Sequence, residues 1–267
     1  MHRRILIIDD HDDLASALDG VFSQVGHSVS ILENHREALK IGNMQDFDLV
    51  ITDIDIESNV PDTAVNDNEH ECLPEPFENT SSEHLKAFKV CASNFRLDEF
   101  DEDELKNLVE TVLNYKSQFV DKVDLVQDLR EKIEFELPSS ISLMHTVLDY
   151  LMRRVEKLGV IKSEQSNLFV ALDEAFVNAV KHGNKFDSGK LIRIVAEVSR
   201  QEARFTIEDE GEGFDVNSIP DPLDPQNIFK TSGRGVLFIY NIMDEVKYND
   251  RGNRLTMVKR SELPVIS

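Results

Sequence analysis

Short apolar runs alternate with helical patterns in the first fifty residues. Residues 4–9 (Arg-Ile-Leu-Ile-Ile-Asp), 29–32 and 49–53 are short and apolar, and two of them run into acid, as buried strands do. Residues 12–25 carry apolar side chains at helical spacing and are followed by Gly26, a residue typical of helix ends. The alternation predicts an α/β domain with a doubly wound parallel sheet.

A loop and a long helical pattern follow. Residues 57–80 are rich in Asn and Pro, which indicates a loop. Apolar residues then recur in steps of three and four, interrupted only by Lys122: Leu105, Leu108, Val112, Tyr115, Phe119, Val126, Leu129 and Ile133. This is the spacing of a and d positions. For Leu105–Val112 it favours a helix that packs on its own domain, and for the portion after Tyr115 it predicts a connecting helix that can dimerise. We expect the helix from about Leu105 to Ile133 to hold a homodimer in part.

The second half of the chain contains two further helical patterns, 142–158 and 164–183, after Pro138 ends the long one. In the second pattern, Glu174 and Asn178 lie four residues apart and therefore on one helix face. The Asn side chain offers a neutral oxygen suited to Mg²⁺, and a nearby carboxylate can accept a proton. Such a pair alone is more often exposed surface, so its meaning depends on its surroundings.

Two glycine-containing segments supply those surroundings. Asp209-Glu-Gly-Glu-Gly-Phe-Asp215 follows the predicted strand 203–207 and has two glycines where a backbone can approach a ligand closely. Alone, it would be an ordinary turn more often than a binding site. Ser232-Gly-Arg-Gly-Val-Leu-Phe238 leads from a glycine-rich loop into a helix, whose first N–H groups can meet phosphate oxygens.

Together, in this order, the three segments resemble the ATPase superfamily of gyrase, the heat-shock chaperones and the histidine kinases, known as the GHKL or Bergerat type. They look most like its anti-sigma-factor serine kinase branch. The resemblance covers about 134–260 and includes the opening Phe-Glu-Leu-Pro and the closing Leu255-Thr-Met-Val-Lys259. It implies an α+β domain in which a mixed sheet packs on helices, with ATP and Mg²⁺ as ligands.

The resemblance also implies roles for single residues. Glu174 would be the general base, Asn178 the Mg²⁺ ligand and Asp209 the acceptor for the adenine amino group. The other nucleotide-binding positions would be Gly211 and Gly213 in the adenine pocket, Gly233, Arg234 and Gly235 in the phosphate-facing lid, and Thr256 behind the adenine.

Two further residues, Lys181 and His145, are candidates for roles in phosphate binding and phosphorylation. Lys181 lies one turn from Asn178 and could reach a phosphate, although an exposed lysine is more often only surface. His145 is followed by Thr146 and not by the acid that follows a phosphoacceptor histidine, which argues against histidine autophosphorylation.

Residues 4–56 resemble a response-regulator receiver domain. Asp9 and Asp10 end one predicted strand and Asp53 ends another, so their carboxylates would converge at the carboxyl edge of a parallel sheet and could hold Mg²⁺. By the resemblance, Asp53 would be the phosphoacceptor.

This chain departs from the receiver pattern at two functional positions. The lysine and proline of the family fall on Asp98 and Glu99, and its switch hydroxyl falls near Pro76, with Thr80 the nearest. An acid in place of the lysine adds repulsion to an acidic pocket, so we expect little response to small phosphodonors. The alternative is a degenerate receiver that is kept as a docking or dimerisation module.

The composition and net charge exclude some classes of binding partner. The net charge is −22, and residues 1–133, with 12 basic and 30 acidic residues, supply −18 of it. This field repels phosphate backbones and no basic patch offsets it, so nucleic acid is not an expected partner. No apolar run reaches the roughly 18 residues of a membrane span. Cys72 and Cys91 lack the spacing of a disulfide framework or a zinc site, and the expected location is cytoplasmic.

These observations predict a receiver-like domain over 1–115, a helical linker over 116–133 and an ATPase domain over 134–267. The predicted function is that of an ATP-dependent serine/threonine protein kinase in a bacterial signalling switch, acting as a homodimer. By the resemblance, its partners would be a small anti-sigma-factor antagonist, a sigma factor or an upstream histidine kinase. The rival function is a non-catalytic ATP-binding protein that sequesters its partner, as an anti-sigma factor or a two-component adaptor does.

Overall fold

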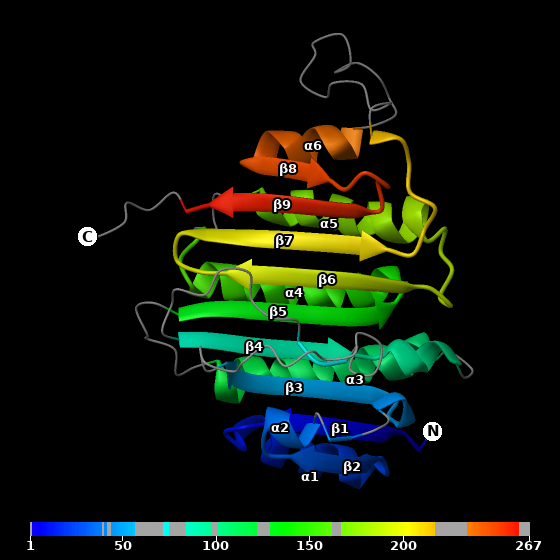
Figure 1. Ribbon diagram of the computed structural model, residues 1–267, viewed down its shortest axis with the longest axis vertical. Helices are drawn as coiled ribbons and strands as arrows, with labels where there is room; N and C mark the ends of the chain where they lie inside the picture. The colour runs from blue at the N-terminus through cyan, green and yellow to red at the C-terminus, as the bar shows by residue number, and fades with distance from the viewer. Residues whose placement is uncertain are drawn as a thin grey trace. The chain divides into compact units, whose positions relative to one another are not determined.

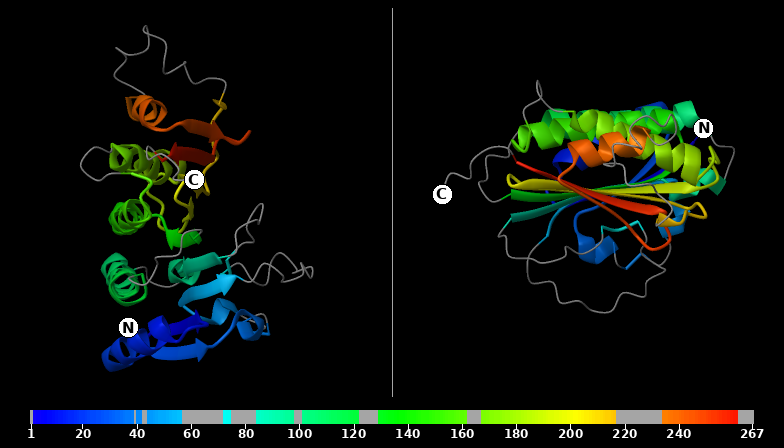
Figure 2. Two further views of the ribbon diagram at one scale, coloured as in Figure 1. Left: turned by 90° about the vertical axis from the view of Figure 1, so that its left-hand side faces the viewer. Right: turned by 90° about the horizontal axis from the view of Figure 1, so that it is seen from above.

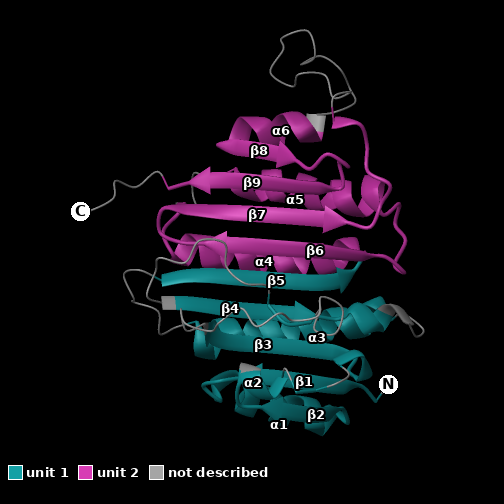
Figure 3. Cartoon of the chain, in the orientation of Figure 1, with its two compact units in different colours: residues 1–138 teal, residues 139–267 magenta. Residues whose placement is uncertain are grey.

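The chain divides into two compact units, Met1–Pro138 and Ser139–Ser267, which we call unit 1 and unit 2 (Figure 3). The computed structural model describes residues 2–38, 40–41, 44–56, 72–74, 84–97, 101–121, 129–161, 167–216 and 234–261. The domain boundary predicted at residue 134 falls inside a strand of unit 1, so the division lies at the end of that strand.

Unit 1 is a sheet with helices on both faces (Figures 1 and 2). Its described strands are β1 (Arg4–Asp9), β2 (Ser28–Leu32), β3 (Leu49–Ile56), β4 (His84–Cys91) and β5 (Leu129–Pro138), in the order β2-β1-β3-β4-β5. Helices α1 (Asp13–Val25) and α3 (Glu102–Tyr115) lie on one face and the short α2 (His35–Ala38) on the other. Short 3₁₀ turns span Met44–Asp46 and Ser93–Leu97.

The predicted parallel sheet is confirmed only for the first three strands. Strand β1 pairs in parallel with β2 and with β3, and its side chains from Ile5 to Ile8 are fully buried. Strand β4, by contrast, runs antiparallel to β3 and parallel to β5. An antiparallel neighbour needs no crossover helix, and residues 57–80, which join β3 to β4, show the composition of a loop. Most of that segment lies outside the described residues.

The predicted long helix is wrong. Helix α3 ends at Tyr115 and continues only as a π-helical turn, Lys116–Val120, and residues 129–138 form β5. Ile133, Phe135 and Leu137 alternate with acids at period two, which is the pattern of a strand, although the first of them also fits the three-and-four spacing. The helix predicted over 116–133 therefore does not include residues 129–133, and residues 122–128, Lys122 among them, lie outside the described residues.

The apolar face of α3 is used inside the chain. Five side chains that carry the predicted seam or adjoin it are between 0 and 5% exposed: Leu105, Leu108, Val109, Val112 and Leu113. The helix packs against α1, and Asp101 caps its start by accepting a hydrogen bond from the Glu104 N–H at 3.0 Å. The packing of Leu105–Val112 on its own domain, which the sequence favours, is thus observed.

Cys72 and Cys91 form a disulfide, which the sequence analysis did not expect. Their Cα atoms are 5.4 Å apart, and both residues are buried. The bond joins the short described segment 72–74 to the end of β4. Because the two cysteines are separated by 19 positions and by a loop, their spacing along the chain does not indicate that they pair.

Unit 2 is a sheet covered by three helices on one face (Figure 2). Its helices are α4 (Ile141–Lys157), α5 (Leu168–Asn178) and α6 (Arg234–Ile242), and a π-helical turn, Ala179–Gly183, prolongs α5. Its strands are β6 (Leu191–Val198), β7 (Glu202–Asp209), β8 (Glu245–Tyr248) and β9 (Arg254–Arg260), antiparallel in the order β6-β7-β9-β8. The predicted layer of helices on a sheet is confirmed for this unit.

Candidate functional site

Helix α5 and its π-helical turn carry three of the predicted site residues in unit 2. Glu174 and Asn178 are half-buried, one turn apart, and Asn178 is the last residue of α5. Lys181 lies in the π-helical turn and is exposed, in keeping with the alternative of a surface lysine.

The carboxylate of Glu174 lies against the first turn of α6. A Cβ atom on Gly235 would stand 2.2 Å from Oε2 of Glu174, a distance that no real pair of atoms of this kind adopts. A side chain at this position would therefore force the Glu174 carboxylate to move, and the glycine leaves room for it. Gly233 lies outside the described residues, and the same holds for the side chain of Arg234.

Asp209, at the end of β7, packs against the other end of the α5 extension. A Cβ on Gly183 would lie 2.3 Å from its carboxyl carbon, and a Cβ on Gly211 would lie 2.4 Å from the Gly183 carbonyl oxygen. The Gly211 N–H donates to Asp209 Oδ1 at 2.8 Å. Burial raises the pKa of the Asp209 carboxyl, and the Gly211 hydrogen bond opposes that rise. The two glycines thus let the backbone close around one desolvated carboxylate.

Two asparagines that the sequence analysis missed hold the backbone beside Asp209. Asn184 is fully buried; its side chain accepts from the Glu210 N–H at 2.9 Å and donates to the Leu191 carbonyl at 2.8 Å. The Asn253 side chain donates to the Asp209 carbonyl at 2.8 Å. Both asparagines directly follow a glycine in the sequence, and that Gly-Asn pairing was the available signal.

The remaining predicted positions lie on the sheet and its loop. Thr256 on β9 faces Thr206 on β7, and their hydroxyl oxygens are 3.2 Å apart. Gly213 has a φ of +75°, and a Cβ there would lie 1.9 Å from the Arg251 carbonyl oxygen. A glycine is required at this position for both reasons.

One helix therefore joins the two ends of the candidate site. Glu174 meets the N-terminus of α6, Gly183 meets Asp209, and nine residues separate the two contacts, or roughly 13 Å of helix. A helix N-terminus favours an anionic group, and a buried carboxylate favours a hydrogen-bond donor. The arrangement suits an elongated ligand that is anionic at one end and carries a donor at the other, and the residues present fit a nucleotide.

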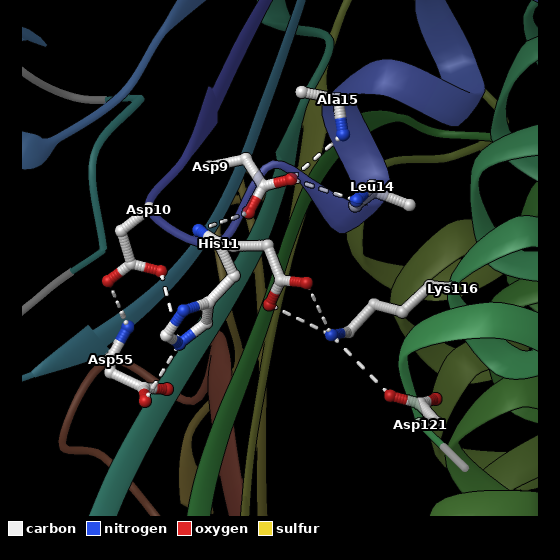
Figure 4. Close-up of polar contacts among 9 residues, drawn as sticks. Asp9, Asp10, His11, Leu14, Ala15, Asp55, Lys116 and Asp121 are labelled. Carbon is white, nitrogen blue, oxygen red and sulfur yellow. Dashed lines mark hydrogen bonds and ion pairs between the residues drawn. The ribbon is translucent and has the colours of Figure 1, made fainter. Parts of the chain in front are cut away.

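Unit 1 contains the second candidate site, at the carboxyl ends of β1 and β3 (Figure 4). Asp9 accepts hydrogen bonds from the N–H groups of Leu14 and Ala15, both at 2.8 Å, and so caps helix α1. Asp10 accepts from the Asp55 N–H at 2.8 Å. Burial raises the pKa of the Asp10 carboxyl, and the Asp55 hydrogen bond opposes that rise.

The structure gives Asp53 a cation that the sequence analysis missed. The Lys116 ammonium donates to both oxygens of Asp53, at 2.8 and 2.9 Å, and lies 3.5 Å from Asp121 (Figure 4). It also stands 4.7 Å from the ring centre of Phe88, the residue opposite Asp53 on β4. A lysine four residues after Val112, on the apolar stripe of α3, was the signal for a buried lysine.

Burial and the neighbouring charges act in opposite directions on the pKa of each member of this ion pair. Burial raises the pKa of Asp53 to about 6, against the opposing effect of Lys116. Burial alone would lower the pKa of Lys116, but the charges of Asp53 and Asp121 outweigh it and raise that pKa. The three predicted acids are thus engaged with the protein itself, and the described residues contain no cluster of His, Cys, Asp and Glu that could hold a metal ion. The Mg²⁺ site predicted at Asp9, Asp10 and Asp53 stays a prediction.

The second part of the chain is similar to a known family of domains. Residues 137–259, a little less than half of the chain, match the family described as the histidine kinase-like ATPase domain. The serine-protein kinase RsbW of Staphylococcus epidermidis is 28% identical over 50% of this chain and 89% of its own length. RsbW of Staphylococcus aureus (strain Newman) is 27% identical over the same shares.

One solved structure is also similar, a crystal structure of the RsbU and RsbW domains of a Mycobacterium tuberculosis protein. Its TM-score is 0.34 at 18% identity, and the match covers 49% of this chain and 32% of that one. This chain therefore spans about a third of the length of that structure. Within the described residues, no helix is both long and apolar enough to cross a membrane.

Proposed function

We propose that unit 2 binds Mg-ATP and transfers the γ-phosphoryl group to a serine or threonine of a partner protein, and that unit 1 regulates this transfer. The observation that carries the proposal is the Glu174 carboxylate at the N-terminus of α6, on the same helix that reaches Asp209. The similarity to proteins named serine-protein kinase RsbW supports the same reaction.

In this proposal, the residues of the predicted nucleotide site have the following roles. Asp209 accepts a hydrogen bond from the adenine amino group, with Gly211, Gly213 and Thr256 around the base. The first N–H groups of α6, with Gly233, Arg234 and Gly235, face the phosphates. Asn178 would hold Mg²⁺, which supplies positive charge to the β- and γ-phosphates when bound.

Glu174 then acts as the general base. The partner hydroxyl oxygen forms a bond to the γ-phosphorus while the bond from that phosphorus to the bridging oxygen of ADP breaks. The hydroxyl proton passes to the Glu174 carboxylate, and ADP leaves. His145 is a poor rival acceptor, because Thr146 follows it in place of the acid that follows a phosphoacceptor histidine.

The proposed partner is a small anti-sigma-factor antagonist, and a sigma factor would be the protein released or held by the switch. Unit 1 is proposed to be a degenerate receiver that docks a partner or another copy of this chain and acts without phosphorylation of Asp53. The burial of Asp53 supports this proposal, because its side chain is 10% exposed and offers a phosphodonor little access.

Nucleotide binding and transfer, measured side by side on the full chain, test the proposal. Calorimetry with Mg-ATP gives binding, and labelled ATP with the antagonist protein gives transfer. Binding together with transfer to the antagonist supports the kinase. Binding without transfer supports the rival, a protein that sequesters its partner and uses ATP only for its shape, and no binding contradicts both.

A further inference from the structure

The turn between β8 and β9, residues 248–254, is braced from within. The side-chain oxygen of Asn249 accepts three backbone N–H groups, from Gly252 at 2.9 Å and from Asn253 and Arg254 at 3.1 Å each. Its side-chain nitrogen donates to Asn253 Oδ1 at 3.0 Å. One side chain therefore fixes the path of this hairpin turn without help from any ligand.

The hairpin turn is bonded to the Asp209–Phe214 loop along the whole length of that loop. At one end, the Asp209 N–H donates to the Asn253 carbonyl at 3.0 Å. In the middle, the Arg251 guanidinium donates to the Gly211 carbonyl at 2.8 Å. At the other end, the Phe214 N–H donates to the Arg251 carbonyl at 3.1 Å.

The two segments also fit without spare room. A Cβ on Gly213 would meet the Arg251 carbonyl oxygen, and a Cβ on Gly252 would lie 2.3 Å from the Phe214 carbonyl oxygen. The Phe214 and Tyr248 rings meet edge to face with their centres 5.2 Å apart. Among the described side chains of the hairpin turn, that of Arg251 donates to the middle of the loop, where the Gly211 N–H donates to Asp209.

We propose that Arg251 is a positioning residue for nucleotide recognition: by holding the Gly211 carbonyl, it fixes the residue whose N–H orients the Asp209 carboxylate. The inference rests on the proposed function, because it assumes that Asp209 reads the adenine. Arg251 does not touch the base in this account. It acts through Gly211, and its loss should therefore cost selectivity for the base as well as affinity.

The test is calorimetry on the full chain with Mg-ATP and with Mg-GTP. In Arg251→Met, the loss of one charge-assisted hydrogen bond should raise the dissociation constant for ATP about tenfold, and the preference for ATP over GTP should fall by a similar factor. Arg251→Lys, which keeps a donor, should restore part of both. Arg254→Met is the matched control, because Arg254 lies in the same turn but pairs with Glu208 at 2.8 Å and does not touch the loop.

The outcomes separate this inference from the proposed function. A wild-type chain that binds neither nucleotide overturns both. A wild-type chain that binds ATP while Arg251→Met binds it equally well overturns only the role of Arg251. Equal weakening for ATP and GTP, with a lowered melting temperature and no rescue by Arg251→Lys, would mean that the arginine serves stability alone and would also overturn it.

Discussion

At the scale of single residues, the account of unit 2 depends on Glu174. The carboxylate is half-buried and lies at the start of a helix, where Gly235 leaves room for it. A group in this position can take a proton from a hydroxyl that approaches the phosphates, and it needs no contact with the adenine end of the site. Its loss should therefore affect transfer and spare binding.

Glu174→Gln should lower the rate of phosphoryl transfer by roughly 10²- to 10⁴-fold, the usual contribution of a positioned general base. The dissociation constant for ATP should change little, because the amide keeps the shape of the side chain. Single-turnover transfer and calorimetry measure the two effects separately. Glu212→Gln, at a side chain that is 88% exposed, is the control. Loss of both binding and transfer would show that the assigned role is wrong.

The Lys116–Asp53 pair makes a second prediction at this scale. Because the pKa of Asp53 is raised to about 6 in the folded chain, against about 3.9 for a free aspartate, the folded state holds a proton between these values that the unfolded state releases. Stability therefore falls as the pH rises through that window. Lys116→Met removes the cation and should raise that pKa further.

We expect Lys116→Met to cost about 3–5 kcal/mol of unfolding free energy at pH 8, where a buried charge is left without its partner, and clearly less at pH 5, where Asp53 takes up a proton. Urea unfolding at the two pH values measures the difference. Lys106→Met is the control, since Lys106 forms an exposed pair with Glu110 on the same helix. An equal cost at both pH values would contradict the raised pKa.

The sequence could identify a functional residue where the residue type and its neighbours form a known motif. Glu174 and Asp209 stood out because a carboxylate and its glycines recur in a recognisable order. Lys116 and Arg251 did not stand out, because each works through a contact that only the fold creates. The cation beside Asp53 arrives from the end of α3 and not from the position where the receiver pattern has its lysine.

At the scale of elements, α3 and β5 show where periodicity misleads. The first strand and the first helix were predicted within a residue or so, because their burial follows their own local pattern. The spacing of Leu129 and Ile133 fits a helix as well as a strand. They form a strand because β5 pairs with β4 over eight residue positions, from Leu129 to Glu136. Pairing partners distant in the sequence were not visible from periodicity.

Because the apolar face of α3 is buried within the chain, Leu105→Ala should destabilise the protein and should not dissociate a dimer. Leu105 is fully buried, and such a truncation costs about 2–5 kcal/mol. Urea unfolding and light scattering give the two readouts, with Val25→Ala, at a side chain that is 71% exposed, as the control. If the Leu105→Ala variant is as stable as the wild-type chain and has half its measured mass, the result would support a dimer interface on α3.

At the scale of the whole molecule, the two compact units differ in charge, and we propose a different role for each. Residues 1–133 supply most of the net negative charge, while the ATPase domain match begins at residue 137. We therefore expect the acidic half to meet proteins and the second half to meet the nucleotide. The composition did not predict the antiparallel β4 that makes unit 1 differ from a regular doubly wound sheet.

Unit 1 should not form a stable adduct with small phosphodonors. The Asp53 side chain is 10% exposed, which leaves a phosphodonor little access to its oxygens. Mass spectrometry after treatment with acetyl phosphate or beryllofluoride measures this, with Asp53→Asn as the control. A stoichiometric adduct that disappears in Asp53→Asn and alters the activity of the kinase would make unit 1 a working receiver.

The central claim is that the ATPase domain passes its phosphoryl group to a hydroxyl of another protein. The most direct measurement incubates the full chain with Mg-ATP and the anti-sigma-factor antagonist and locates the phosphoryl group by mass spectrometry. The account predicts an acid-stable phosphoserine or phosphothreonine on the antagonist, which Glu174→Gln fails to produce. An acid-labile phosphoryl group on a histidine of this chain, with the antagonist unmodified, would contradict it.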